Sequence, residues 1–158
     1  TNKIIIFLGI NRLSYLKKGI NYFEKALEII REKYADKVEI IVTENLPYNE
    51  YISIYNKAHI LLDQVFAYDQ GYNALEAMAK GKVVFTGAET EFLNQYQLQE
   101  DEVCINALPN ETEIAAKLSL LIEHPEKIIA ISKNARNFIE KQHDYKTIAT
   151  KYLACWEA

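Results

Sequence analysis

The segment from Asp69 to Gly81 holds the residues of this chain that are best suited to chemistry. Gly71 begins a helix-forming run, Glu76 is the one carboxylate inside that run, and Gly81 closes it before an apolar strand. A helix N-terminus carries unpaired backbone N–H groups and the positive end of the helix dipole, so it attracts an anion. One turn inside, the Glu76 carboxylate can accept hydrogen bonds from vicinal hydroxyls. A phosphate at the helix start and hydroxyls at Glu76 together describe a nucleotide-sugar site.

A basic loop, Gly9–Gly19, is expected directly after the first strand and contains Arg12, Lys17 and Lys18. Arginine binds phosphate through a planar fork of donors, and lysine supplies a mobile point charge. Two such cations would stabilise a diphosphate, and would do so more strongly as it becomes a leaving group. The alternative is an ordinary solvated basic loop.

Acidic residues precede the helix that starts at Gly71. Asp69 can contact a ligand, or it can be the N-cap of the helix, which stabilises a helix by about 1 kcal/mol. Asp63, at the expected end of a strand, is open to the same two interpretations. Glu76 also has a simpler alternative, because a Glu on a helix surface is usually only solvated.

Short β-rich runs alternate with segments of helical periodicity along most of the chain. Strands are expected at Ile4–Leu8, Val38–Val42, His59–Leu62, Val83–Thr86 and Val103–Ile105. Helices are expected at Gly19–Tyr34, Glu50–Lys57, Gly71–Lys80, Thr90–Leu98, Glu111–Glu123, Pro125–Gln142 and Tyr145–Trp156. This alternation predicts an α/β fold, a Rossmann-like parallel sheet of about five strands flanked by helices, with additional helices at the C-terminus.

Ligands of such sheets bind at the carboxyl ends of the strands. The loops expected there are Gly9–Lys18, Thr43–Asn49, Asp63–Gln70 and Gly87–Glu91. Functional residues should therefore lie in these four loops.

Length and composition are those of one ordinary domain of 158 residues. A net charge of −4 argues against a nucleic-acid partner, because binding a duplex requires neutralisation of its phosphates. Cys104 and Cys155 lie in apolar stretches without a CxxC pattern, which favours buried thiols in the cytoplasm over a disulfide. The longest apolar run, Ile4–Ile10, is too short for a transmembrane segment, which needs roughly 20 residues.

Several motifs of other enzyme classes are absent from the sequence. It contains no GxGxxG after the first strand, no GxxxxGK[ST] and no GxSxG. The histidines form no HxxxH pair and no cluster with the cysteines. We therefore expect neither a metal site nor a bound cofactor, with a nucleotide sugar as co-substrate instead.

The chain resembles the C-terminal, donor-binding domain of family-four retaining glycosyltransferases, which have the two-domain GT-B architecture. The resemblance covers essentially the whole chain, and its most specific part is the stretch from Gly71 through Glu76 to Val84. The loop from Gly9 through Arg12 to Gly19 looks like the family's Gly-Arg…Lys-Gly loop, with two extra residues after Gly9. Further similarity lies in the segments 46–59 and 135–152.

The resemblance implies a role for each matched residue. Arg12 and Lys18 would be the catalytic cations that stabilise the leaving diphosphate without a metal ion. Glu76 would hold the ribose hydroxyls, and the turn at Leu46 would border the nucleobase, uracil or guanine. The donor-binding residues it implies are Gly9, Leu46, Asp69, Gly71, Tyr72, Asn73, Ala74 and Glu76.

Two positions depart from the family pattern. The family usually has a second Glu, eight positions before Glu76, that contacts the transferred sugar, and Tyr68 stands there in this chain. Asp69 could take its place after a shift of one residue, the sugar could be held differently, or the domain could have lost activity. Lys82 replaces a frequent proline, a change we expect to be harmless.

The resemblance also implies that residues 1–158 form one donor-binding domain and that an N-terminal acceptor domain is missing. The chain would then not turn over alone. The full enzyme would act in polysaccharide biosynthesis in the cytoplasm, with peripheral attachment to the membrane as an option. Two alternatives stay open: a catalytically silent GT-B-like binding or scaffold module, and a nucleotide-sugar epimerase.

Overall fold

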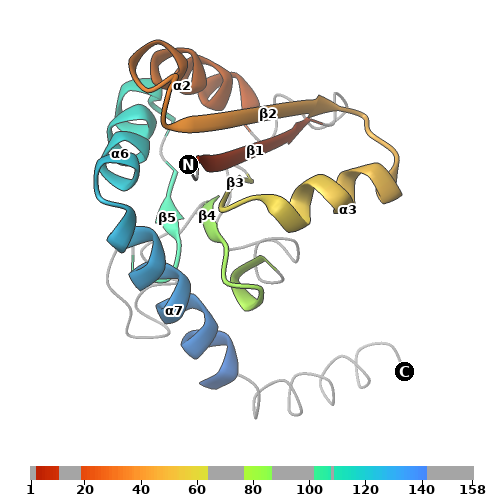
Figure 1. Ribbon diagram of the computed structural model, residues 1–158, viewed down its shortest axis with the longest axis vertical. Coiled ribbons are helices and arrows are strands. Elements are labelled where there is room, and N and C mark those ends of the chain that lie inside the picture. The colour runs from red at the N-terminus through yellow and green to blue at the C-terminus, as the bar shows by residue number, and fades with distance from the viewer. Residues whose placement is uncertain (1–2, 11–18, 64–76, 87–101, 108, 142–158) are drawn as a thin grey trace.

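A parallel sheet forms the centre of the protein in the computed structural model, which describes residues 3–10, 19–63, 77–86, 102–107 and 109–141 (Figure 1). The sheet has five strands in the order β2-β1-β3-β4-β5. The strands are β1 (Ile4–Ile10), β2 (Val38–Glu44), β3 (Ile60–Leu62), β4 (Val83–Thr86) and β5 (Ile105–Asn106). The predicted α/β fold with a parallel sheet is therefore confirmed.

Helices cover both faces of this sheet. They are α2 (Ile20–Lys33), α3 (Tyr48–Lys57), α6 (Glu111–Glu123) and α7 (Pro125–Lys141). A further helical turn, Ala77–Ala79, comes just before β4 and belongs to the predicted helix Gly71–Lys80. The predicted helices at 90–98 and 145–156 lie outside the described residues.

The first face of the sheet packs against α2 and α6, which lie side by side (Figure 1). Its buried cluster contains Ile6 and Leu8 of β1 together with Phe23 of α2 and Leu118 of α6. Because side chains of a strand alternate between faces, Phe7 of β1 lies in the opposite cluster.

The second face packs against α3, α7 and the turn Ala77–Ala79. Phe7, Leu61 and Val84 meet Tyr55 of α3 and Met78 there. Strands β3 and β4 are buried on both faces, which explains why their sequences are continuous apolar runs.

Some boundaries differ from the predicted ones. Strands β1 and β2 continue to Ile10 and Glu44, two residues further than expected, because their parallel pairing extends through these positions. Helix α3 begins at Tyr48, directly after Pro47, whose carbonyl accepts from the amide of Tyr51 at 2.9 Å. Strand β5 comprises Ile105–Asn106, which pair with Phe85 and Thr86 of β4.

None of the helices in the described ranges is both long and apolar enough to cross a membrane.

Candidate functional site

The strand order reverses between β1 and β3, which marks this place as the candidate ligand site. The chain leaves β1 for β2 on one side and later enters β3 on the other side of β1. In open parallel sheets, ligands bind outside the carboxyl ends of the strands at such a reversal of order. Segments 11–18 and 64–76, which are predicted to bind the ligand, follow β1 and β3 directly. The topology therefore brings the starts of both segments to one edge of the sheet.

The hydrogen-bonded pairing also ends earliest between these two strands. Strand β1 stays paired with β2 as far as Ile10, and β3 stays paired with β4 as far as Leu62. The last pair between β1 and β3 is Phe7 with Leu61. No further pair of β1 with β3 is found within the described part of the chain, in which the segment after β3 ends at Asp63.

Two of the predicted site residues lie within the described ranges, namely Gly9 and Leu46. The predicted residues that lie outside them are Arg12, Lys18, Asp69, Gly71, Tyr72, Asn73, Ala74 and Glu76. Ala77 and Met78 follow Glu76 directly and are completely buried against the second face. The C-terminal part of the predicted donor helix is thus held firmly against the sheet.

Gly9 is the second-last residue of β1 rather than part of a loop, and helix α3 passes directly over it. A Cβ atom at this position would lie 2.9 Å from Cε2 of Tyr51 and 3.4 Å from Cζ of Phe7. No side chain fits there without a shift of the Tyr51 ring. The glycine therefore permits the close approach of α3 to the sheet.

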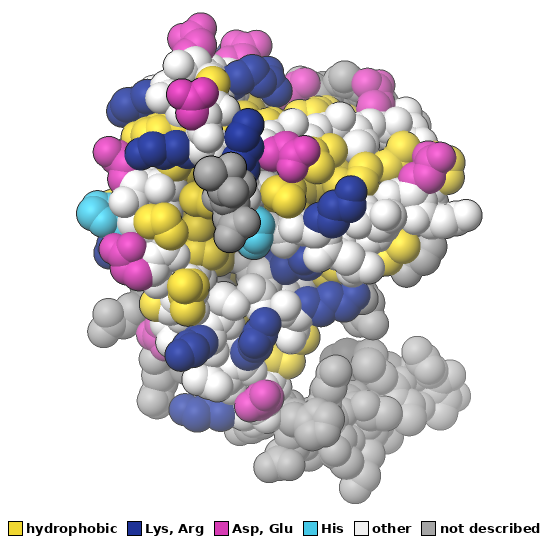
Figure 2. All heavy atoms as spheres, viewed as in Figure 1, with side chains coloured by type: hydrophobic (Ala, Val, Ile, Leu, Met, Phe, Trp, Pro, Cys, Tyr) yellow, Lys and Arg dark blue, Asp and Glu magenta, His cyan; other side chains and the backbone are white. Residues whose placement is uncertain are grey.

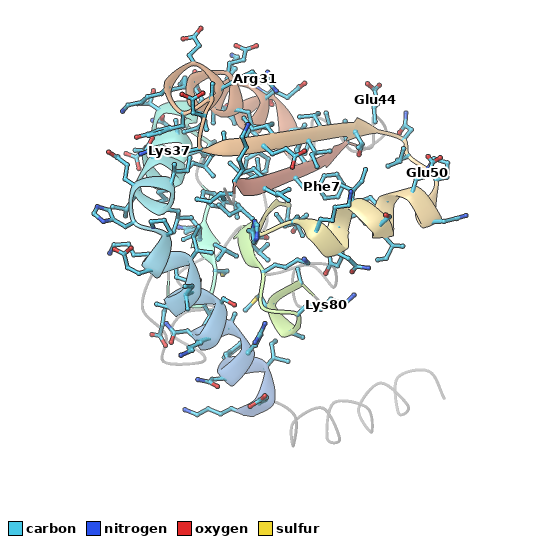
Figure 3. All side chains as sticks on the ribbon, viewed as in Figure 1. Phe7, Arg31, Lys37, Glu44, Glu50 and Lys80 are labelled. Atoms are coloured by element: carbon cyan, nitrogen blue, oxygen red, sulfur yellow. The ribbon has the colours of Figure 1, made fainter. Side chains whose placement is uncertain are left out.

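The turn that carries Leu46 is attached to the end of β1. The amide of Asn45, which adopts a positive φ of 50°, donates to the carbonyl of Ile10 at 2.8 Å. Leu46 follows and is half-buried. Glu44 and Glu50 lie at either end of the turn, where β2 passes into α3 (Figure 3). The turn that carries Leu46 is thereby fixed to Ile10, the last residue of β1.

An aromatic stack holds α3 in this position. The ring of Phe7 lies between β1 and α3 (Figure 3), 5.3 Å from the ring of Tyr51, which stacks on Tyr55 at 6.0 Å. Aromatic pairs at these separations contribute roughly 0.5–1.5 kcal/mol beyond their buried area. The packing of α3 on β1 therefore supports the turn that carries Leu46.

On the other side of the reversal, polar residues end two neighbouring strands. The hydroxyl of Thr86, the last residue of β4, donates to Oδ2 of Asp63 at 3.0 Å. The amide of Asp63, the residue after β3, donates to the carbonyl of Phe85 at 2.9 Å. Thr86 is completely buried and Asp63 is half-buried. The pair fixes a carboxylate at the ligand edge of the sheet.

Sequence reasoning left Asp63 ambiguous and missed Thr86. The signal was present as two short apolar runs, Ile60–Leu62 and Val83–Phe85, each followed at once by a polar residue. The contact itself depends on β3 and β4 being neighbours, which no local pattern shows.

At the opposite, amino-terminal edge of the sheet, Lys82 and Gly81 form hydrogen bonds to neighbouring helices. The Lys82 side chain is buried, and its Nζ donates to the carbonyl of Ala58 at 2.8 Å and of Asn56 at 3.3 Å, at the C-terminal end of α3. The hydroxyl of Ser132 in α7 donates to the carbonyl of Gly81 at 2.6 Å. Helices α3 and α7 and the turn before β4 are thus joined behind the ligand edge.

Two groups at this rear edge have shifted pKa values. Burial, reinforced by the charge of Lys82, lowers the pKa of His59, whose Nδ1 accepts from the amide of Ile5 at 3.0 Å. Burial, reinforced by the neighbouring Lys80, lowers the pKa of Lys82. Both shifts follow from the cost of placing a charge away from water.

Metal ligands do not gather in the part of the chain that the structure describes: no three His, Cys, Asp or Glu side chains are grouped to hold an ion. Cys104 is buried, as predicted.

Comparison with known proteins gives one family and a consistent set of structural neighbours. A family model described as glycosyl transferase-like matches residues 16–154. No curated protein sequence matches the chain.

The structural neighbours include glycosyltransferases. The C-terminal domain of a glycosyl transferase group 1 family protein (LpcC) from Francisella tularensis has 21% identity and a TM-score of 0.62, over 89% of this chain and 85% of that chain. Anabaena Alr3699/HepE in complex with UDP and glucose has 13% identity and a TM-score of 0.67. The match covers 99% of this chain and 48% of that chain. A mutant of TarM from S. aureus, in a complex containing UDP, has 13% identity and a TM-score of 0.68. The match covers 99% of this chain and 36% of that chain.

The chain thus spans most of the isolated C-terminal domain but less than half of the two longer proteins. At these identities the likeness shows a shared fold, the Rossmann-like C-terminal domain of GT-B proteins.

Proposed function

The chain belongs to the glycosyl transferase-like family, and from this premise we propose that it binds the nucleotide-diphosphate sugar of a retaining, metal-independent transfer reaction. One observation carries the proposal. The two segments predicted to hold the diphosphate start at the carboxyl ends of β1 and β3, where the order of the strands reverses and their pairing stops.

In the mechanism we propose, positive charge stabilises the leaving diphosphate. Arg12 and Lys18 of the segment after β1, together with backbone N–H groups at Gly71, bind the phosphate oxygens. Each such donor contributes a few kcal/mol to the transition state, because removing one preorganised donor typically costs about 100-fold or more in rate. The acceptor attacks from the face on which the diphosphate departs, and a donor phosphate oxygen takes its proton.

The remaining contacts orient the nucleotide. Glu76 accepts hydrogen bonds from the ribose hydroxyls, and it lies one residue before the buried anchor at Ala77. Leu46 borders the nucleobase on the turn that is bonded to the end of β1. The acceptor binds to a separate N-terminal domain, which closes over this one in the cytoplasm.

The proposal is tested by titrating the chain with UDP, GDP and their common sugar conjugates by calorimetry, without added metal. A half-site binds weakly, and a Kd of about 1 mM corresponds to only about −4 kcal/mol. We expect selective binding of one diphosphate, weakened about tenfold or more by Lys18→Ala and by Glu76→Ala. The matched controls, Lys25→Ala and Glu28→Ala on the outer surface of α2, should bind as the wild type does.

A second candidate function is a silent binding module, and an apolar surface hollow favours it. A cavity of about 220 Å³ lies between β5, α6 and α7, and Leu120 and Ile129 are exposed near it. Figure 2 shows hydrophobic side chains over these helices on the face in view. If no nucleotide diphosphate bound to a well-folded sample, the donor-binding function would be wrong and this module would replace it.

A further inference from the structure

We propose that Asp63 is the residue that binds hydroxyl groups of the transferred sugar, with Thr86 as the positioning residue that orients its carboxylate. This proposal rests on the donor-binding function proposed above and assigns the sugar subsite of the same site. It gives the sugar a ligand on the sheet rather than in the segment 64–76.

The position of Asp63 supports this role. It is the first residue after β3, and β3 forms one side of the place where pairing with β1 has ended. The alternation of side chains puts Asp63 on the same face as Leu61, which is the face covered by α3 and by the turn Ala77–Ala79. Ala77 and Met78, which follow the predicted ribose ligand Glu76 in the sequence, are buried on this face as well.

The hydrogen bonds of Asp63 make its carboxylate a rigid ligand. Its backbone amide is bonded to the carbonyl of Phe85, and its Oδ2 accepts from the hydroxyl of the completely buried Thr86 at 3.0 Å. Groups held by strands keep a more accurate geometry than groups on loops. A carboxylate accepts about four hydrogen bonds in all, so the bond from Thr86 is compatible with bonds from a ligand.

The charge of Asp63 decides which part of the donor it contacts. A carboxylate repels a diphosphate at short distance, so it cannot serve as a phosphate ligand at this edge. Hydroxyl groups are donors that a carboxylate binds strongly, because the acceptor is ionised. Glu76 is assigned to the ribose, and the sugar hydroxyls are the donors that remain for Asp63.

The test compares two ligands that differ only in the sugar. The chain and its Asp63→Asn variant are titrated with the nucleoside diphosphate that the wild type binds and with the corresponding nucleotide sugar. We expect Asp63→Asn to weaken binding of the nucleotide sugar about tenfold and to leave the Kd of the free diphosphate unchanged within about twofold. Asp36→Asn, an exposed carboxylate in the turn before β2, is the matched control and should change neither constant.

Two variants of Thr86 test the positioning role. Thr86→Val keeps the shape of the side chain but removes the hydroxyl, and it should weaken sugar binding about threefold without affecting the free diphosphate. Thr86→Ser keeps the hydroxyl and should restore wild-type selectivity. Thermal unfolding of each variant confirms that the fold is intact.

The outcomes are distinguishable. If Asp63→Asn bound both ligands as tightly as the wild type, or weakened both equally, the sugar assignment would be overturned while the donor-binding function stood. If the wild type bound neither ligand, both proposals would fail together.

Discussion

The carboxyl edge and the amino edge of the sheet both carry polar side chains close to the core, but they use them differently. At the carboxyl edge, Asp63 and Thr86 end two strands beside the place where β1 and β3 stop pairing. At the amino edge, Lys82 and His59 are bonded to the backbone of neighbouring elements. At the carboxyl edge the buried Thr86 hydroxyl bonds the half-buried Asp63 carboxylate, whereas the polar groups of the amino edge join helices to strands.

The polar groups of the amino edge bond to carbonyls at the ends of neighbouring elements. The C-terminal carbonyls of a helix lack partners within the helix and carry its negative dipole end. Lys82 bonds to these carbonyls of α3, and Ser132 bonds to the turn before β4. Helices α3 and α7 are thereby both bonded to the segment Gly81–Lys82 before β4.

The largest effect on stability is expected from Gly81→Ala at the amino edge. Gly81 has a φ of 77°, and an added Cβ would overlap the guanidinium of Arg136. The backbone strain and the overlap should lower the free energy of unfolding by about 2–3 kcal/mol, measured by urea unfolding. Adding Arg136→Ala should recover part of the loss. Full additivity of the two changes would contradict the overlap.

A somewhat smaller loss is expected from Lys82→Met. The substitution keeps a long apolar side chain in the buried position but leaves the carbonyls of Ala58 and Asn56 without this donor. Unfolding free energy should fall by about 1–3 kcal/mol. Lys80→Met, which changes an exposed lysine that lies over the same Tyr55 ring, should cost only about 0.5 kcal/mol. Equal effects of the two variants would show that the buried hydrogen bonds of Lys82 contribute nothing.

At the carboxyl edge, Thr86→Val should change stability by no more than about 1 kcal/mol, because it removes one hydrogen bond and adds no strain. The same variant should impair sugar binding, so stability and binding separate at this edge. A Thr86→Val protein destabilised as much as the Gly81→Ala variant would mean that the carboxyl edge is as structural as the amino edge.

The smallest effect is a pH dependence from His59. Its pKa in the folded protein is lowered from 6.5, so between the two values the unfolded chain holds the proton more tightly. The stability that depends on a neutral His59 is therefore complete above pH 6.5, and it is lost as the pH falls through the pKa of His59 in the folded protein. Urea midpoints at pH 7.5 and 5.5 should differ less in His59→Asn, whose amide can still accept from Ile5, than in the wild type. An unchanged difference would assign the acid sensitivity to other groups.

Much of the fold follows from local patterns. The apolar runs at Ile60–Leu62 and Val83–Phe85 predict buried parallel strands, and both are found. Pro125 begins α7 as its favoured position in the first turn predicts. The structural role of Lys82, a buried lysine bonded to α3, was not predicted, although its presence in place of proline was noted. The residue type alone does not show that the carbonyl of Ala58, 24 positions away, accepts a hydrogen bond from this lysine.

The sequence by itself determined the described strands and helices, to within a few residues, and their α/β alternation. These depend on residues within one turn or one strand, where periodicity and capping act. Tertiary structure alone decided that the pairing of β1 with β3 ends at Phe7 and Leu61. It also decided that Tyr51 covers Gly9, and that the hydroxyl of Thr86 bonds to Asp63, 23 positions away. Strand order and register arise from the packing of whole faces against helices, and that information is spread over the entire chain.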